Sequence, residues 1–379
     1  MNNLNCPNFT QHFENLSDPR IETSNKRHEL MDIVLLSVLS VICGADSFAD
    51  IERFGIAKED FLRKILNLPN GIPSHDVINN VLSKLDPKEL QEGFISWVQS
   101  FGKLNDSDIV AIDGKTVRRS FKGGDKKSAI HMVSAFRAAN HTVLGQVKVD
   151  EKSNEITAIP ELLKLLNLEG SIVTIDAMGC QKSIAADIRR AQADYVLSLK
   201  GNQGNLLDDV SQYLDAMIDE GFKAEHSKQF ETIEKGHGRI ETRRCWITDN
   251  IDWLTYKSDW AGLKTIGAVE SERVNVSTGE TSIERRYFIC SIDSDAELFA
   301  KAVRSHWAIE NNLHWTLDVV FKEDGSRIRE GYAAENMVVM RHLSLNMLKK
   351  ETTKESIRGK RLRAGWDDKF LISVLSTVL

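Results

Sequence analysis

Two aspartates occur in nearly the same local pattern, and that pattern suggests metal chemistry. Asp113 lies in VAIDGKT and Asp176 lies in VTIDAMG, each at the end of a short, mostly apolar run. Burying a carboxylate among apolar residues is costly unless a charge or hydrogen bonds compensate. A divalent cation compensates directly, and hard ions such as Mg²⁺ prefer a few oxygen ligands while keeping positions open for water and phosphate. Two such strands therefore predict a metal site at one sheet edge.

A third carboxylate is expected to complete the site, and the segment HWAIENNLHWTLDVVF contains two candidates. On a helix, Glu310 shares a face with His306 and His314 through spacings of about one turn. Asp318 lies eight residues further on, roughly on the same stripe. The residues alone leave both acids open as the third ligand. The two histidines are eight apart, a poorer spacing for a zinc pair than four.

The elements around these acids alternate between strand and helix patterns. They are a strand in DIVAIDGKTV, two strands around the turn 139–141, a helix over 156–168, a strand in SIVTIDAMG, a helix over 181–193 and a short strand in DYVLSLKGNQG. This order predicts a mixed sheet with helices on its faces. Residues 205–293 combine a helix near 206–216 with several β-like runs and suggest an inserted β-rich subdomain. Residues 296–317 and 337–350 return to helix.

Residues 1–103 are predicted to be helical. Leu30–Ala45 is apolar on most sides, and Phe48–Leu66 has apolar positions at helical spacing. Ser74 is placed to cap a helix that runs to about residue 85, and Pro87 stands at an allowed first-turn position of the next helix. The short helix, turn and helix form either a helix-turn-helix-like DNA reader or a bundle that only packs on the next domain.

Bulk composition bounds the class of protein. The chain has 379 residues, 41% of them hydrophobic and 27% charged, which is typical of a soluble globular protein with two or three units. The longest apolar stretch, 33–43, is about half of what a bilayer span needs, and the polar N-terminus does not resemble a signal peptide. Five scattered cysteines indicate neither a disulfide frame nor a thiolate zinc site. We expect a cytoplasmic location and no membrane partner.

The net charge of −6 argues against a nucleic-acid partner, but the basic residues are unevenly spread. Lys115–Lys127 has six basic residues and one acid, and Lys349–Arg363 has seven and two, so each run carries +5. A third cluster is KGHGRIETRR, at 235–244. Each run can be a solvated face. The first, however, directly follows the Asp113 motif, which favours phosphate contact there.

Several polar residues are predicted to contact DNA beside the acids. Lys200, Asn202 and Gln203, which follow the third strand, are expected at the same sheet edge as the acids. His237 lies in a Gly-rich turn and can touch phosphate or simply form the turn. Trp307 and Trp315 can stack on bases or pack in the core. The predicted DNA contacts are Lys115, Arg118, Arg119, Lys200, Asn202, Gln203, His237, Arg239, Arg304 and His306.

Over essentially its whole length the chain resembles the H-repeat-associated insertion-sequence transposases, a DDE-type family with a ribonuclease-H-like core. The resemblance rests on long motifs in the family's order, among them AIDGKTVRRS, HMVSAF, LGQVKVDEKSNEITAIPELL, VTIDAMGCQ, YVLSLKGNQ, EKGHGRIETRR, HWAIENNLHWTLDVVFKED and AGWDDKFL. Carried over motif by motif, it makes Asp113, Asp176 and Glu310 the catalytic and metal-binding acids and favours Glu310 over Asp318. Many relatives of the wider group have a Tyr and an Arg before the Glu and a Lys after it; this chain departs from that spacing, so the roles of Arg304 and His306 are not carried over.

The resemblance implies an α/β fold: a ribonuclease-H-like mixed sheet with flanking helices, an inserted β-rich subdomain and an all-helical N-terminal domain. The implied division is 1–103 for the helical associated domain, 104–204 for the first part of the core, 205–293 for the insertion, 294–350 for the rest of the core with the Glu helix, and 351–379 for a basic C-terminal tail.

The implied activity is cleavage of phosphodiester bonds at element ends and strand transfer into target DNA. Two Mg²⁺ (or Mn²⁺) ions would activate the attacking water and stabilise the leaving 3′ oxygen. The implied partner is double-stranded DNA, and because two DNA ends must be paired, we expect a homodimer on DNA. Two alternatives remain: a nuclease of the same fold that does not join strands, and a decayed copy that binds DNA without cutting it.

Overall fold

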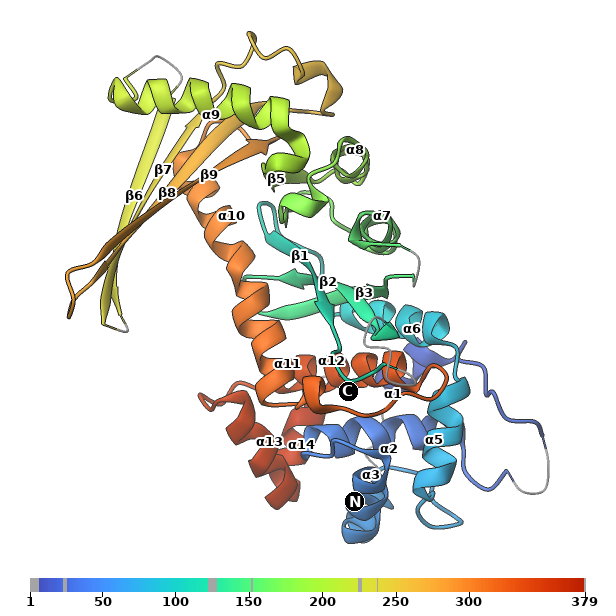
Figure 1. Cartoon of the computed structure of the whole chain (residues 1–379). Helices are drawn as coiled ribbons and strands as arrows, with labels where there is room; N and C mark the ends of the chain where they lie inside the picture. Colours follow the sequence, from blue (N-terminus) through green and yellow to red (C-terminus); the bar gives the residue numbers. More distant parts are fainter. Residues whose placement is uncertain are drawn as a thin grey trace.

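The computed structural model describes residues 7–22, 26–121, 128–150, 153–223, 227–236 and 238–377. These residues form a mixed α/β structure around one nine-stranded sheet, with a helical body at one end (Figure 1). The predicted mixed sheet with helices on its faces is confirmed. No helix in the described ranges is long and apolar enough to span a bilayer.

The sheet has the strand order β3-β2-β1-β4-β5-β9-β8-β7-β6. Strands β1, β4 and β5 are parallel to one another, and every other neighbouring pair is antiparallel. The strands are β1 (Ile109–Thr116), β2 (His131–Arg137), β3 (Thr142–Lys148), β4 (Ile172–Ile175), β5 (Asp194–Ser198), β6 (Ser227–Gly236), β7 (Arg239–Thr248), β8 (Thr265–Asn275) and β9 (Thr281–Cys290).

Helices cover both faces of the sheet. Helices α7 (Glu155–Leu165), α8 (Lys182–Arg190) and α9 (Gly204–Asp219) share a core with Val110 and Ile112 of β1. Helix α10 (Ala296–Ala308) packs on the opposite face, against Ile109 and Ile172. Because side chains alternate along a strand, Asp113 falls on the α10 face.

Strands β6 to β9 extend the same sheet and do not form a separate one, since β9 pairs with β5. The β-like runs expected in 205–293 are β7, β8 and β9. Strand β6 was not expected, because SKQFETIEKG has few apolar residues and neither face of this edge strand is buried.

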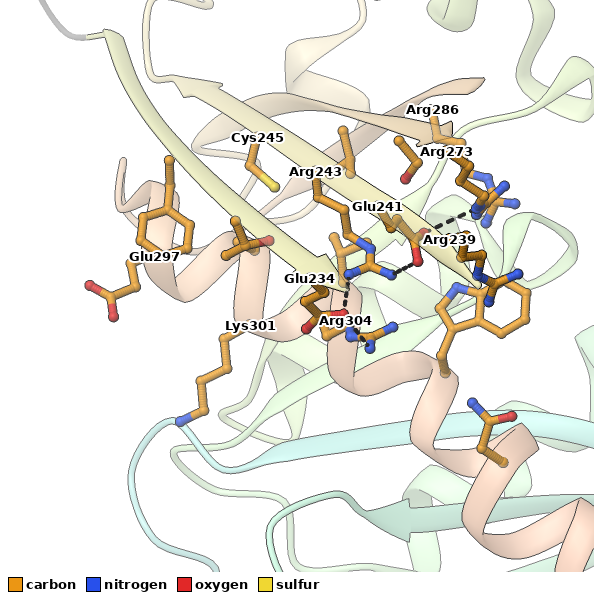
Figure 2. A pocket seen from close by; sticks show the side chains of 18 residues that line it. Glu234, Arg239, Glu241, Arg243, Cys245, Arg273, Arg286, Glu297, Lys301 and Arg304 are labelled. Atoms are coloured by element: carbon orange, nitrogen blue, oxygen red, sulfur yellow. Dashed lines mark hydrogen bonds and ion pairs between the residues drawn. The ribbon is translucent and has the colours of Figure 1, made fainter. Parts of the chain in front are cut away.

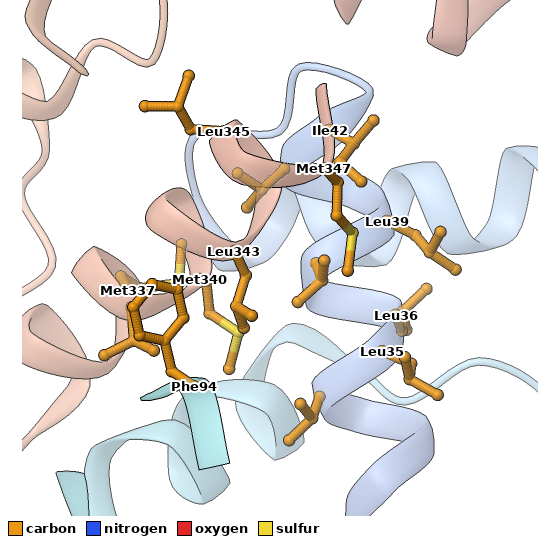
Figure 3. Close-up of a cluster of buried hydrophobic side chains, with 14 of the residues drawn as sticks. Leu35, Leu36, Leu39, Ile42, Phe94, Met337, Met340, Leu343, Leu345 and Met347 are labelled. Atoms are coloured by element: carbon orange, nitrogen blue, oxygen red, sulfur yellow. The ribbon is translucent and has the colours of Figure 1, made fainter. Parts of the chain in front are cut away.

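The helices of the two ends of the chain share one core, as Figure 1 shows in blue and red. Leu36 and Leu39 of α2 meet Met340 and Leu343 of α12, and Phe94 of α6 closes the cluster (Figure 3). The N-terminal helices are α1 (Pro7–Thr10), α2 (Leu30–Ile42), α3 (Phe48–Ala57), α4 (Glu59–Leu62), α5 (His75–Lys84) and α6 (Pro87–Gln99). The C-terminal ones are α12 (Ala333–Lys350), α13 (Ile357–Trp366) and α14 (Asp368–Ser376).

The segment 351–379 was expected as a basic tail, but most of it folds into α13 and α14. Two of its cations are buried and donate to backbone carbonyls: Lys360 to Leu348 at 3.0 Å and Arg361 to Val41 at 2.8 Å. These bonds join the last helices to α12 and α2. Part of the positive charge of this run is therefore used inside the fold.

The predicted helix starts in the N-terminal region are confirmed. The Ser74 hydroxyl accepts a hydrogen bond from the Val77 amide at the start of α5, and Pro87 is the first residue of α6. Both helices bury their apolar residues within the shared core. This packing accounts for the apolar faces of the pair, and a DNA-reading role for it stays a prediction.

Candidate active site

The register of the parallel strands makes Asp113 and Asp176 neighbours. Ile112 of β1 is the paired partner of Ile175 of β4, and each acid is the next residue. Adjacent strands lie about 4.8 Å apart, and equivalent positions on them point to the same face. Asp176 also caps the turn after β4, where its carboxylate accepts from the amides of Met178 at 3.0 Å and Gly179 at 3.4 Å.

Glu310 comes to these acids from α10, which runs across their face of the sheet. Directly after α10 the chain makes a π-helical turn, Ile309–His314. Such turns are frequent at functional sites. Glu310 is exposed, and within the described part of the chain its side chain has no hydrogen bond or ion pair. Glu310 lines a hollow of about 490 Å³ together with Asp113, His314 and Asp318, and we call this the acidic hollow.

Asp318, the alternative third ligand, has a partner. The Lys115 ammonium lies 2.7 Å from one of its carboxylate oxygens. Lys115 also contacts the carboxylates of Glu323 at 2.9 Å and Asp324 at 3.5 Å. Asp318 is thus bound up in an ion-pair cluster, whereas Glu310 is free to take a ligand.

The site concentrates negative charge. Burial raises the pKa of Asp113 to about 7, and the charges of Glu155, Asp176 and Glu310 add to that rise. His314 Nδ1 lies 3.6 Å from the Asp113 carboxylate. However, burial and the Lys115 charge lower the pKa of His314 to about 4, so the ring is neutral at pH 7 and does not offset the carboxylates.

The donor set fits a hard divalent cation in kind, because carboxylate oxygens are the ligands that Mg²⁺ prefers. A cation would also favour the ionised form of Asp113, which burial and the neighbouring acids disfavour. In the ranges that the structure describes, no three His, Cys, Asp or Glu side chains already lie close enough to share one ion. The backbone brings the acids together, but their side chains do not yet form a ligand cluster.

Comparison with known proteins identifies the group to which such a site belongs. Residues 104–347 match the family model described as "Transposase DDE domain", and residues 10–98 match one described as "DDE_Tnp_1-associated". The chain belongs to the transposase DDE domain family. The resemblance to H-repeat-associated transposases is confirmed, since the chain is 42% identical to the "H repeat-associated putative transposase YhhI" of Escherichia coli K12 over 97% of both chains.

Two further similarities accompany this match. This chain is also 42% identical to the "Putative transposase YncI" of Escherichia coli O157:H7, over 95% of this chain and 92% of that one. Among solved structures it is similar to a piggyBac transposase in a synaptic complex with hairpin DNA, with a TM-score of 0.39 and 9% identity over 98% of this chain and 77% of that chain.

The predicted DNA contacts are spread over several places on this DDE-domain protein. Lys115 is largely buried by the three carboxylates around it. Burial alone would lower its pKa, but Glu323 and Asp318 together raise it. Its ammonium therefore joins β1 to the segment after the Glu310 helix.

Arg118 and Arg119 line a second hollow, of about 710 Å³, with Arg327 and Arg329. None of the described residues that line it is acidic, although Arg118 also pairs with Asp324 at 3.2 Å. It adjoins the acidic hollow through Thr116 and Arg118, which line both. Sequence reasoning missed Arg327 and Arg329. Their alternation in SRIRE, shortly after the Glu310 motif, was the only available indication.

We call the hollow lined by Arg118, Arg119, Arg327 and Arg329 the arginine hollow. A hydrogen bond and a cation–π contact fix Arg329 within it. The Arg329 Nε donates to the Arg119 carbonyl at 2.8 Å. The Arg329 guanidinium also stacks 4.5 Å from the centre of the Phe121 ring. The rest of the first basic run, 122–127, lies outside the described residues.

Asn202, which is exposed, and Gln203 both donate hydrogen bonds to backbone carbonyls. Asn202 donates to the Ala177 carbonyl at 2.7 Å, and Gln203 donates to the Cys180 carbonyl at 3.0 Å. Both bonds tie the loop after β5 to the loop that follows Asp176. These residues position the second acid, while Lys200 beside them is exposed.

Arg239 and Arg304 line a groove of about 580 Å³ between α10 and the β6–β8 face (Figure 2). Arg304 pairs with Glu234 at 3.0 Å, and Arg243 pairs with the same carboxylate at 2.9 Å. Within the described residues Arg239 has no ion pair. The predicted contact His237 lies outside the described residues.

His306 and Trp307 lie near the end of α10, and Trp315 is the first residue of α11 (Trp315–Val319), after the π-helical turn. Trp307 is partly exposed in the groove, with the Arg286 guanidinium 5.7 Å from its ring centre, and Trp315 is exposed in the acidic hollow. Neither ring is core. His306 instead packs on β4, where its Nδ1 lies 3.1 Å from the Thr174 hydroxyl, and burial lowers its pKa.

Proposed function

We propose that this chain is a DNA transposase that cuts phosphodiester bonds at the ends of its element and joins the freed ends to target DNA. The observation that carries the proposal is the placement of the acids: Asp113 and Asp176 are adjacent on parallel strands, and Glu310 lines the Asp113 hollow from the crossing helix. The order β3-β2-β1-β4-β5, with the first three strands antiparallel, supports a ribonuclease-H-like core.

Asp113, Asp176 and Glu310 are the proposed ligands of Mg²⁺ or Mn²⁺, and two bound ions would activate a water and stabilise the leaving 3′ oxygen. The protein's own part is to fix these carboxylates. The Met178 and Gly179 amides orient Asp176, and Lys115 binds Asp318 so that Glu310 is the free acid of its helix.

Double-stranded DNA is the proposed partner. The arginine hollow adjoins the acidic hollow and offers guanidinium groups, the chemistry that binds phosphate; of these, Arg118 also pairs with Asp324 at 3.2 Å. The groove along α10 offers Arg239, Lys301 and the partly exposed Trp307. A homodimer on DNA follows from the need to pair two element ends, and a cytoplasmic location stays a prediction.

The metal site is tested by titrating Mn²⁺ into the wild type and Asp113→Asn in a calorimeter. We expect binding by the wild type and loss of it in the variant. Equal binding by both proteins would contradict the site.

The chemistry is tested by incubating the element's own ends with Mg²⁺. Glu310→Gln should abolish cleavage and keep DNA binding, while Asp318→Asn should still cut. The reverse pattern would show that Asp318 is the third ligand. Joined products separate a transposase from a nuclease of the same fold, and absence of any cleavage by the wild type would favour a decayed copy.

The arginine hollow is tested by DNA binding at several salt concentrations. Replacing Arg327 with Ala should weaken binding to all sequences and reduce the salt slope by about one, as loss of a phosphate contact does. Arg358→Ala is the matched control, because Arg358 is exposed on α13. Equal salt slopes for both variants and the wild type would remove this hollow from the proposed DNA path.

A further inference from the structure

The groove between α10 and the β6–β8 face carries an excess of positive charge. Among the described residues that line it, six are basic and three are acidic. The basic residues are Arg239, Arg243, Arg273, Arg286, Lys301 and Arg304, and the acids are Glu234, Glu241 and Glu297. Trp307 and Asn311, which flank Glu310 in the sequence, line the groove as well. The groove therefore offers a polyanion a path to the neighbourhood of Glu310.

Glu234 of β6 bridges two walls of this groove (Figure 2). Its Oε2 accepts hydrogen bonds from Arg304 Nη2 of α10 at 3.0 Å and from Arg243 Nη1 of β7 at 2.9 Å. Glu234 is the only acid with which Arg304 pairs among the described residues. The Arg243 hydrogen bond lowers the pKa of Glu234, so the carboxylate is ionised at neutral pH. An anionic oxygen between two guanidinium groups stands where a phosphate oxygen would bind.

The other acid that pairs with Arg243 differs from Glu234 in burial. Glu241 is buried, and Arg243 and Arg273 hold it at 2.6 Å and 3.0 Å. By contrast, the side chains of Glu234 and Arg304 are each 52% exposed, and β6 is an edge strand with a neighbour on one side only. Because exposed ion pairs are weak, a competing anion can replace Glu234 on Arg304. Glu241, in contrast, belongs to the packing of the β6–β9 extension.

We propose that Glu234 is an intramolecular stand-in for a DNA phosphate, which masks Arg304 in the free protein and leaves it when DNA enters the groove. The inference rests on the proposed function, because it takes DNA as the partner. It gives the groove a built-in competitor that lowers its affinity for polyanions. Removing the charge of Glu234 should therefore strengthen DNA binding, whereas a bracing role for the same ion pair predicts unchanged or weaker binding.

The test measures binding of a duplex with the element's end to the full chain by fluorescence anisotropy, in EDTA so that the DNA is not cut. Glu234→Gln is compared with the wild type and with Glu231→Gln. Glu231 is the matched control, because it lies on the same strand, is 49% exposed and does not line the groove. Its partner Arg244 keeps Glu270 at 3.2 Å and Glu272 at 2.9 Å, so the control unmasks no cation.

The expected gain is modest, since breaking an exposed ion pair corresponds to at most about a fivefold change in affinity. We expect Glu234→Gln to bind about three- to fivefold tighter than the wild type at about 0.1 M salt, and Glu231→Gln to bind like the wild type. The gain should vanish when Arg304→Gln is added to Glu234→Gln, because no masked cation is left to release.

Each other outcome overturns the inference. Equal or weaker binding by Glu234→Gln would show that the ion pair braces β6 against α10. Equal tightening in Glu234→Gln and Glu231→Gln would reduce the effect to net charge, and a gain that persists without Arg304 would show that Arg304 is not the masked group. If the wild type and all variants fail to bind DNA, the proposed function fails and the inference falls with it.

Discussion

For Lys115, a structural role and a DNA-binding role predict different effects of its replacement on stability and on DNA affinity. Its ammonium contacts Asp318 at 2.7 Å and Glu323 at 2.9 Å. The Lys115 side chain is 11% exposed and that of Glu323 is 1% exposed. Replacing Lys115 with Met leaves Glu323 buried with Arg341, 3.2 Å away, as its remaining cation. We therefore expect Lys115→Met to lower the free energy of unfolding, independently of its effect on DNA binding.

The magnitude follows from the burial of the pair. Removing one partner of a buried ion pair costs about 3–5 kcal/mol, because an uncompensated charge is left behind. Arg341 still compensates in part, so the lower end, about 3 kcal/mol, applies to Lys115→Met. For a large domain about 1 kcal/mol shifts Tm by about 2 °C. Lys115→Met should therefore melt about 6 °C below the wild type.

The assay is a thermal melt paired with a DNA-binding titration. Lys322→Met is the control, because Lys322 pairs with Asp46 at 2.8 Å but is 70% exposed. Exposed pairs contribute less than about 1 kcal/mol, so this variant should melt within about 2 °C of the wild type. If Lys115→Met melts like Lys322→Met and loses DNA affinity, Lys115 is a phosphate contact and the reasoning from burial is wrong.

Two further predictions concern stability. In EDTA, the wild type should lose stability as pH rises from about 4 to 7. The reason is that the pKa of Asp113 is about 7 in the folded protein, so the unfolded chain releases this proton at lower pH. Asp113→Asn should weaken this pH dependence, and the same change of Tm with pH in both proteins would contradict the prediction. Gly331→Ala should lower Tm more than Gly279→Ala, because both glycines have positive φ but only at Gly331 would a Cβ overlap the Ser83 carbonyl; equal melting temperatures would show that this contact relaxes without cost.

The parts of the fold that the sequence predicts well are those whose burial is uniform. Parallel strands buried on both faces are continuous apolar runs, so β1 and β4 could be located together with their acids. Strand β6 could not be located, because it has no apolar face of its own. It is a strand only because it pairs with β7. Its formation depends on residues elsewhere in the chain.

The same distinction applies to the site. The local pattern singled out Asp113 and Asp176, but helical spacing alone left Glu310 and Asp318 equivalent. What separates these two acids is Lys115, which lies far earlier in the chain and contacts Asp318 but not Glu310. A periodicity argument does not contain that contact. The buried cations of α13 illustrate the same limit, since a run of positive charge does not reveal which of its members the fold encloses.

The acids around β1 differ in function because their neighbours differ. Asp318 and Glu323 meet a cation of the protein itself and so serve the fold. Asp113 faces other carboxylates and a neutral histidine, so its ionised form is disfavoured and a bound cation would stabilise it. The arginines of the adjoining hollow line a second surface, and only Arg118 among them also reaches the hollow of Asp113. This separation of a carboxylate cluster from a cationic hollow suits a polyanionic substrate whose reacting phosphate meets a bound cation while its flanking phosphates meet arginines.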